Sequence, residues 1–202
     1  MSYKSKPLPL TFACAATDSK LFPSDTGNEI ALCGRSNSGK STLINALANQ
    51  KKLAKTSNTP GRTQSINFFH LANDDEKKIV DLPGFGYAKA SKQDQNAWAK
   101  LILSYLEKRA ALTALILIMD MRHPFQNKDL EFLSLCESLN LPIHLVLTKA
   151  DKLNNKETQT TLKVVSEKMA DYPAIVDSLV FSATKKKGLE TLLNKIKPLL
   201  EV

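Results

Sequence analysis

The segment LCGRSNSGKSTLINAL, residues 32–47, sets the architecture expected for the whole chain. An apolar run ends at Gly34, and a pattern with helical spacing starts at Ser41. Successive backbone N–H groups of a glycine-rich turn between a strand and a helix point inward and bind phosphate oxygens. The spacing Gly34-x4-Gly39-Lys40-Ser41 therefore predicts a phosphate-binding loop, in which Lys40 reaches the terminal phosphates and the Ser41 hydroxyl ligates Mg²⁺.

Length and composition indicate one globular domain over residues 1–202, with residues 1–20 as a short N-terminal arm. Hydrophobic residues make up 43% of the chain and charged residues 24%. No apolar run reaches the roughly 18 residues that a membrane-spanning helix needs, so no membrane association is expected. Cys14, Cys33 and Cys136 are scattered without metal-binding spacing, which is typical of buried free thiols in a reducing cytoplasm.

The chain carries a formal charge of +8. Its basic residues gather in four clusters, at residues 50–55, 107–109, 184–188 and 194–197. Such a balance favours polyanionic partners such as RNA. The alternative is that these clusters are solvated loops and helix faces.

Short apolar runs alternate with longer helical patterns, which predicts a three-layer, doubly wound α/β fold with helices on both faces of a mostly parallel sheet. Six strands are expected, at residues 29–34, 65–71, 77–84, 114–120, 142–151 and 177–184. Helices are expected at residues 41–50, 92–110, 127–139, 155–170 and 188–201. The second and third strands should form a hairpin at the sheet edge, with one strand antiparallel. Ligands of such folds bind at the carboxyl ends of the strands.

The segment DLPGFGYAK, residues 81–89, follows one of these strands. Asp81 can hold a metal-bound water, and Gly84 can offer its backbone N–H to a terminal phosphate without a side chain in the way. A contact with the γ-phosphate that is lost on hydrolysis makes a conformational switch. The polar segment TSNTPGRTQSINF, residues 56–68, could present a threonine to Mg²⁺, either Thr63 or the less favoured Thr59.

Two further strand ends suggest residues that recognise the base of a nucleotide. In LTKAD, residues 147–151, the Asp151 carboxylate can accept hydrogen bonds from guanine N1–H and N2–H2, a donor pair that adenine lacks. The stem of Lys149 can lie along the base plane. In FSAT, residues 181–184, the Ala183 N–H could reach guanine O6.

Together these motifs resemble those of the translation-factor-like GTPases. The segments GRSNSGKSTLINAL, TPGRTQSINFF, DLPGFGYAK, MDMRHPFQNKD and TKADKL closely resemble the YihA/EngB family of bacterial ribosome-biogenesis GTPases, in the TrmE–Era–EngA–YihA–septin group, from about residue 10 to residue 200. The resemblance implies a P-loop GTPase that binds GTP, GDP and Mg²⁺ and hydrolyses GTP slowly. It also implies a cytoplasmic protein, expected to be a monomer, with a role in assembly of the large ribosomal subunit and a link to cell division and septation.

The resemblance also implies roles for individual residues. The phosphate-binding set is Gly34, Arg35, Ser36, Asn37, Ser38, Gly39, Lys40 and Ser41. Mg²⁺ would be held by Ser41, Thr63 and, through water, Asp81. The first switch would comprise Gly61, Arg62, Thr63, Gln64 and Ser65, and the second would run from Asp81, Leu82, Pro83 and Gly84 to about Lys89. The base would be read by Thr148, Lys149, Ala150 and Asp151, with Phe181, Ser182 and Ala183 behind it. The residues assigned to hydrolysis are Lys40, Asn37, Thr63 and Gly84.

The chain departs from the usual GTPase pattern at two positions. Thr148 stands where most GTPases have Asn; it cannot donate an amide hydrogen bond, which predicts weaker guanine binding. Phe85 stands where Ras-like enzymes have the Gln that orients the attacking water, so intrinsic hydrolysis should be slow. Asn37 matches an Asn with which related GTPases hold K⁺ near the β- and γ-phosphates, and K⁺ there could stabilise the transition state. The alternative for Asn37 is hydrogen bonding within the loop.

Other residues and functions remain open at this point. Trp98 is expected in the core or at a partner contact. Arg122 and His123 either face a partner or close a loop onto the sheet, and metal binding by His70 or His144 is not expected. One alternative function is a nucleotide-gated scaffold of the division apparatus, in which binding rather than turnover matters. Another is an ATP-dependent kinase, against which Asp151 argues.

Overall fold

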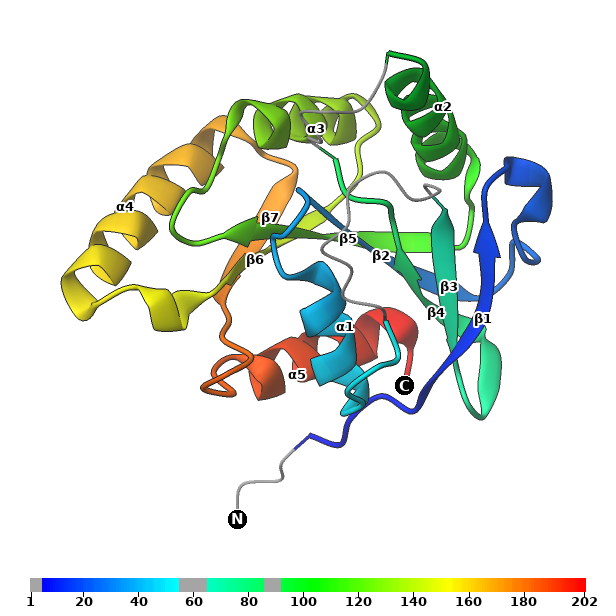
Figure 1. Cartoon of the computed structure of the whole chain (residues 1–202), viewed down its shortest axis with the longest axis horizontal. Coiled ribbons are helices and arrows are strands. Elements are labelled where there is room, and N and C mark those ends of the chain that lie inside the picture. The colour runs from blue at the N-terminus through cyan, green and yellow to red at the C-terminus, as the bar shows by residue number, and fades with distance from the viewer. Residues whose placement is uncertain (1–4, 55–64, 86–91) are drawn as a thin grey trace.

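A computed structural model describes residues 5–54, 65–85 and 92–202 of the chain. In this part a seven-stranded sheet has the order β1-β3-β4-β2-β5-β6-β7 and carries helices on both faces (Figure 1). The strands are β1 (Leu10–Ala16), β2 (Asn28–Gly34), β3 (Ile66–Leu71), β4 (Asp74–Asp81), β5 (Leu112–Asp120), β6 (Ile143–Thr148) and β7 (Ile175–Val180). The helices are α1 (Lys40–Ala48), α2 (Lys92–Lys108), α3 (Asn127–Ser138), α4 (Asn155–Asp171) and α5 (Leu189–Leu200), with short 3₁₀ turns η1 (Ser19–Leu21) and η2 (Ala150–Lys152).

The doubly wound, mostly parallel α/β fold expected from the sequence is confirmed, but the strand count is corrected from six to seven. The additional strand is β1, which lies within the segment expected to be an N-terminal arm. It pairs antiparallel with β3, so the confirmed β3–β4 hairpin lies one strand inside the sheet edge. Most of β1 is exposed, including Phe12, and only Leu10 and Ala16 are buried. An edge strand with so few buried positions has a weak hydrophobic pattern, which explains why the sequence did not reveal it.

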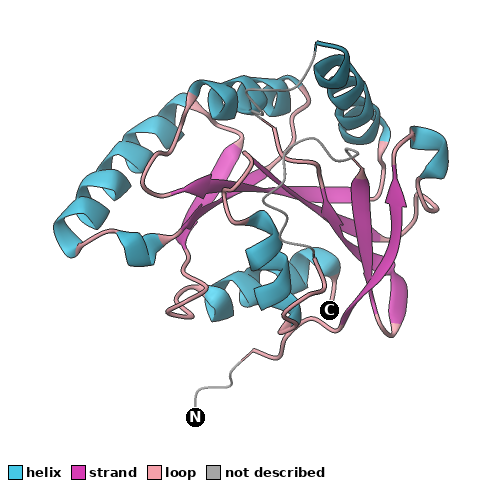
Figure 2. Ribbon diagram, in the orientation of Figure 1, coloured by secondary structure: helices cyan, strands magenta, loops and turns pink. Residues whose placement is uncertain are grey.

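Two hydrophobic layers enclose the sheet. On one face Leu43, Ile44 and Leu47 of α1 pack with Leu192 and Ile196 of α5. On the other face the core includes residues of α2, α3 and α4, among them Tyr105, Phe132 and Val165. Figure 2 shows the strands as a central layer with helices on either side. Strand β2 alternates between the two layers, because Ile30 and Leu32 join the first cluster whereas Ala31 and Cys33 join the second. This packing fixes the carboxyl ends of the strands, where the polar motifs lie.

The three cysteines were expected to be buried free thiols, and Cys14 differs in being only partly buried. Cys14, Cys33 and Cys136 are free thiols, and the last two are buried. Burial raises the pKa of the Cys136 thiol to about 12, which keeps it protonated and unreactive at neutral pH. In the described part of the chain, no helix has both the length and the apolar character needed to cross a membrane.

Candidate functional site

The turn between β2 and α1 forms a cradle at the carboxyl edge of the sheet. Gly39, the N-cap of α1, has φ 103°, and Asn37 has φ 65°, so both lie in the left-handed region. At Gly34 a Cβ atom would lie 2.4 Å from the Ile118 carbonyl oxygen, so only glycine fits there. The Ser36 N–H donates to the Phe85 carbonyl at 3.1 Å, and the Phe85 N–H donates to the Gly34 carbonyl at 3.3 Å. The glycine-rich turn and the segment after β4 therefore run side by side.

Two serine hydroxyls in this turn lack partners. Ser36 Oγ and Ser38 Oγ are buried and form no hydrogen bond with any other described residue. Buried polar atoms in native proteins are almost always hydrogen-bonded, so such atoms call for an explanation. A phosphate bound in the turn would supply oxygen acceptors beside them, and the positive end of α1 favours an anion at this place. The cradle therefore fits a phosphate group.

A cation and a carboxylate meet beside the cradle. Lys40 at the start of α1 forms an ion pair with Asp81 at the end of β4, and their side chains are only 13% and 9% exposed. Asn67 of β3 donates to the other Asp81 oxygen at 3.4 Å. The Ser41 side chain follows Lys40 in the first turn of α1. The structure thus brings together Lys40, Ser41 and Asp81, three of the residues predicted to contact the terminal phosphates and Mg²⁺.

Part of the predicted metal and switch set cannot be placed. Gly61, Arg62, Thr63 and Gln64, and the competing Thr59, lie outside the described residues. Ser65 is described, and its hydroxyl donates to Asn67 Oδ1 at 3.1 Å. The described residues contain no group of three or more His, Cys, Asp and Glu side chains that could hold a metal ion.

Thr148 and Lys149 tie β6 to the glycine-rich turn. The Thr148 hydroxyl lies 2.5 Å from the Ser38 carbonyl and 3.1 Å from the Met119 carbonyl, and Thr148 is buried. Lys149 Nζ donates to the Asn37 carbonyl at 2.6 Å. The Thr148 hydroxyl thus holds the glycine-rich turn from inside the protein, and its expected place beside the base stays a prediction. The stem of Lys149 remains at the site, and its side chain is 31% exposed.

The strand ends of β6 and β7 come together around Asp151. Ser182 Oγ donates to Asp151 Oδ1 at 2.7 Å, and the Ala150 N–H donates to the Phe181 carbonyl at 3.3 Å. The hydrogen bond from Ser182 lowers the pKa of Asp151, which keeps this carboxylate charged. Its side chain is 12% exposed. Ala183 follows Ser182, so the two segments predicted to read the base are adjacent.

Asp120, at the end of β5, is a site residue that the sequence reasoning missed. Its carboxylate accepts from Lys149 Nζ at 3.0 Å and from Arg122 at 2.7 and 2.9 Å. Burial alone would raise the pKa of Asp120, but the hydrogen bonds from Arg122 and Lys149 outweigh it and hold the pKa well below its ordinary value. A carboxylate that ends a buried strand was the signal that identified Asp81, and the same signal could have identified Asp120. Its pairing opposite Thr148 in the sheet places it beside the base-reading segment.

Arg35 belongs to the turn by its backbone, but its side chain leaves the site. The guanidinium pairs with the fully buried Asp129 of α3 at 3.0 Å and donates to the His123 carbonyl at 2.9 Å. Burial raises the pKa of Asp129, although the charge of Arg35 opposes this shift. Since Arg122 binds Asp120 and the His123 carbonyl binds Arg35, the loop after β5 closes onto the sheet. Of the two alternatives for residues 122 and 123, the structure favours this one.

Phe85 is buried rather than aimed at the site. Its ring stacks on Phe132 with centroids 5.0 Å apart and meets the edge of Trp98 at 6.3 Å. The Trp98 indole N–H donates to the Pro83 carbonyl at 3.1 Å, so α2 is tied to the segment after Asp81. Trp98 is partly buried against the core, as expected. Gly84 lies between these anchors, and a Cβ atom there would be 3.3 Å from Ser36 N.

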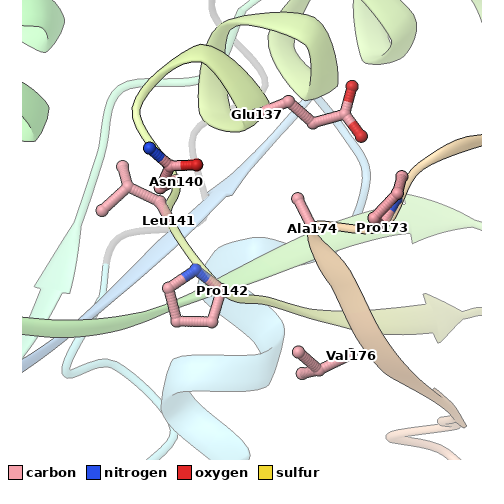
Figure 3. A pocket seen from close by; sticks show the side chains of 7 residues that line it. All are labelled: Glu137, Asn140, Leu141, Pro142, Pro173, Ala174 and Val176. Carbon is pink, nitrogen blue, oxygen red and sulfur yellow. The ribbon is translucent and has the colours of Figure 1, made fainter.

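A surface pocket lies at the amino ends of β6 and β7, at the opposite edge of the sheet from the glycine-rich turn (Figure 3). It has a volume of about 450 Å³, and Leu141, Pro142 and Val176 form much of its wall. Glu137 is its charged residue. Among the described residues that line this pocket there is no lysine or arginine, whereas Lys40 and the N-terminal end of α1 lie at the cradle, so the cradle is the better candidate for a phosphate site.

The fold, the cradle and the strand-end carboxylates define the class of P-loop GTPases. Residues 29–149 match the family model described as 50S ribosome-binding GTPase. A protein from Haemophilus ducreyi described as probable GTP-binding protein EngB is 44% identical over 185 residues, covering 92% of this chain and 87% of the relative. A protein of the same description from Escherichia coli is 43% identical, with the same coverage. The crystal structure of a probable GTP-binding protein engB has a TM-score of 0.66 and 26% identity, covering 86% of this chain and 98% of that structure.

The chain belongs to the EngB family of P-loop GTP-binding proteins. GTP and GDP are its ligands, and its activity is GTP hydrolysis.

Proposed function

We propose that this protein is a GTP-dependent switch that assists assembly of the large ribosomal subunit in the cytoplasm. The observation that carries the proposal is the description of the matching family, 50S ribosome-binding GTPase, for a segment that contains the whole cradle. The formal charge of +8 agrees with a ribosomal partner. An effect on cell division and septation would then follow from a shortage of large subunits.

The described residues suggest how GTP is held. The turn from Gly34 to Ser41 would surround the phosphates, with Lys40 leaving Asp81 to contact the β- and γ-oxygens. Ser41 and Asp81, the latter through water, would hold Mg²⁺ together with Thr63, which lies outside the described residues; the ion neutralises charge on the phosphates when bound. Asp151 would accept from guanine N1–H and N2–H2, and Ser182 would keep its carboxylate charged and oriented. The stem of Lys149, held by Asp120, would cover the base.

Two segments would report the γ-phosphate. A Cβ atom at Gly84 would lie 3.3 Å from Ser36 N, so the Gly84 backbone lies beside the cradle, where its N–H could donate to a terminal phosphate. The same segment is tied to α2 through Pro83 and Trp98, so a shift of Gly84 would reach the surface of α2. Residues 61–65 form the first switch in this proposal, and residues 81–89 the second. The GTP-bound arrangement would dock on the ribosomal precursor, and hydrolysis would release it.

Hydrolysis in this account is slow unless a cation assists. Phe85 cannot orient water, because its ring is buried against Phe132 and Trp98. The Asn37 side chain is exposed and forms no hydrogen bond with another described residue, so it is available to hold K⁺ beside the β- and γ-phosphates. Its backbone carbonyl accepts from Lys149, which fixes its position. Equal hydrolysis rates in K⁺ and Na⁺ would exclude this role for Asn37.

Cosedimentation with purified large ribosomal subunits tests the function. The protein should pellet with the particles when GTP or a non-hydrolysable analogue is present and should stay in the supernatant with GDP. The matched variant is Asp151→Asn, which should lose the response to GTP and gain one to XTP, because an amide at this position donates to the xanthine 2-oxo group. A wild-type protein that ignores the particles in every nucleotide state, but binds division proteins, would favour the scaffold of the division apparatus instead.

A further inference from the structure

Of the four basic clusters in the sequence, the structure neutralises part of two. Arg109 of the cluster at residues 107–109 is buried and pairs with Glu29 at 2.6 Å. Lys195 of the cluster at residues 194–197 forms an ion pair with Asp177. The two remaining clusters, at residues 50–55 and 184–188, keep exposed lysines. Lys51, Lys52, Lys185, Lys186 and Lys187 are therefore exposed and form no ion pair with another described residue. Other exposed lysines, such as Lys20, Lys100, Lys156 and Lys163, share this property, but they lie elsewhere in the chain.

These two segments meet across one cleft between the end of α1 and the loop that leads into α5. The cleft has a volume of about 290 Å³. Asn49, Gln50 and Lys51 line one side, and Ala183 and Lys186 line the other. Residues far apart in the sequence thus form a single surface, here called the lysine cleft, which also includes the exposed neighbours Lys52, Lys185 and Lys187.

The loop that carries three of these lysines is held in a defined shape. Ser182 and Lys187 exchange two backbone hydrogen bonds, each of 3.0 Å, which close a small hairpin. Gly188 at its end has φ 79°, and a Cβ atom there would lie 2.2 Å from the Val180 carbonyl oxygen. The Lys185 N–H donates to Ser182 Oγ at 3.2 Å. A ligand that binds these lysines therefore meets a loop whose backbone is already ordered.

The charge of the lysine cleft is not balanced locally. None of Lys51, Lys52 and residues 185–187 forms an ion pair with another described residue, in contrast to Lys128 and Lys168, which pair with Glu131 and Asp171. The acidic residue closest in sequence is Glu190, in the first turn of α5. Asp151, which accepts from Ser182 at the base of the hairpin, is a second carboxylate near this surface. Five lysines outnumber these two carboxylates, so the surface attracts a polyanion.

We propose that the lysine cleft binds the phosphate backbone of double-stranded RNA and is the surface by which this protein docks on ribosomal RNA. The inference rests on the proposed function and adds the docking site to it. Lysine ammonium groups and the amide of Asn49 suit phosphate and ribose oxygens, whereas the Gln50 amide already donates to the Leu10 carbonyl at 2.9 Å. Single-stranded RNA is bound by stacking on exposed aromatic rings, and the aromatic residue of this cleft, Phe181, is only 2% exposed. The chemistry therefore fits a duplex read by its backbone.

The lysine cleft is also connected to the nucleotide site. Ser182 anchors the hairpin through Lys185 and Lys187 and holds the Asp151 carboxylate with its hydroxyl. RNA bound at the hairpin would thus act on the residues that read guanine. Because coupling between two binding sites is reciprocal, a change of GTP affinity caused by RNA must be matched by the same change of RNA affinity caused by GTP.

The test is a charge-removal pair of variants with equal net charge. One carries Lys185→Gln, Lys186→Gln and Lys187→Gln in the hairpin; the control carries Lys156→Gln, Lys163→Gln and Lys168→Gln on α4, which packs on the opposite face of the sheet. The probe is a fluorescein-labelled stem-loop RNA with a long duplex stem. Its binding is measured by fluorescence anisotropy over a range of KCl concentrations. The hairpin variant should lose at least about tenfold in affinity, and its slope of log K against log salt should fall by about 2. The control should stay within twofold of the wild type.

Three further measurements separate the possible failures. GDP affinity should be equal in all three proteins, which shows that the hairpin variant is folded and retains its nucleotide site. If the wild type cosediments with large subunits in GTP and the hairpin variant does so equally well, the docking surface is wrong while the proposed function stands. If the wild type never cosediments, the proposed function fails. Binding of polyglutamate as tightly as RNA would also overturn the inference, because it would show a surface for acidic protein instead.

Discussion

The substitution Asp120→Asn tests whether the ion pairs of Asp120 with Lys149 and Arg122 hold Lys149 in place at the nucleotide site. Asp120 is 8% exposed and accepts four hydrogen bonds, one from the backbone of Arg122, two from its guanidinium and one from Lys149. The asparagine keeps the shape of the side chain but removes the charge that holds both cations. Lys149 would still donate to Asn37, so the stem should shift rather than leave the site.

The expected magnitude follows from these contacts. A hydrogen bond to a charged group contributes about 1.5–3 kcal/mol, and the partial exposure of Arg122 and Lys149 places the loss at the lower end, about 1.5 kcal/mol of folding free energy. A displaced Lys149 stem should weaken GDP binding by about tenfold, which corresponds to about 1.4 kcal/mol. Because folding lowers the pKa of Asp120, its stabilising contribution is present above the ordinary pKa of about 3.9 and is lost as the pH falls below that value. The difference between the two proteins should therefore be constant near neutral pH and shrink below about pH 4.

The assay combines urea unfolding of the nucleotide-free protein with displacement of a fluorescent GDP analogue. The matched control is Glu131→Gln, which removes one carboxylate from an exposed ion pair on α3 with Lys128 and should change stability by less than about 0.5 kcal/mol. A GDP affinity of Asp120→Asn within twofold of the wild type would refute the positioning role of Asp120. An unchanged free energy of unfolding would refute the contribution of its ion pairs to stability.

Three further substitutions test the other assignments. Phe85→Gln should destabilise the fold by about 3 kcal/mol, because an amide replaces a buried ring between Phe132 and Trp98. It should not raise the rate of GTP hydrolysis. A rate several times that of the wild type would show that this position faces the attacking water. Thr148→Val should lower the free energy of unfolding by about 1–3 kcal/mol and weaken GDP binding, since the buried Ser38 carbonyl loses its hydrogen-bond donor. An unchanged free energy of unfolding and an unchanged GDP affinity would show that the Thr148 hydroxyl does not hold the glycine-rich turn. Ser182→Ala should raise the pKa of the Asp151 carboxyl toward its ordinary value, measured by carbon-13 NMR, and an unaltered pKa would contradict the role given to this hydroxyl.

The sequence was sufficient for the fold because its buried strands are continuous apolar runs. In β5 the last seven residues are buried, and such a run between polar segments has few interpretations. The glycine-rich turn also indicated which segments are strand and helix, since a phosphate loop requires a strand before it and a helix after it. Strand β1 gave no comparable signal, because its pairing with β3 depends on backbone hydrogen bonds and only two of its residues are buried.

The glycines of the turn were predictable because the backbone requires them: a Cβ atom at Gly34 would lie 2.4 Å from the Ile118 carbonyl oxygen, and Gly39 has φ 103°. The roles of the site residues toward a ligand stay predictions. The contacts of a side chain were not predictable where it has several possible partners. Arg35 lies within the phosphate motif, yet its guanidinium turns to Asp129, which is far away in the sequence and fully buried. Thr148 occupies a base-reading position, yet its hydroxyl holds the cradle. The partner of each side chain depends on which buried acceptors would otherwise lack a hydrogen bond. The sequence does not show which acceptors are buried next to a given side chain, whereas the folded structure does.

The most direct test of the central claim is titration calorimetry of GDP, GTP, XTP and ATP with Mg²⁺, for the wild type and Asp151→Asn. The account predicts that the wild type binds GDP and GTP but not ATP, and that the substitution abolishes guanine binding or shifts it to xanthine, because Asp151 is the acceptor for the guanine donor pair. Equal affinity for ATP and GTP, unaffected by the substitution, would contradict the reading of guanine by Asp151.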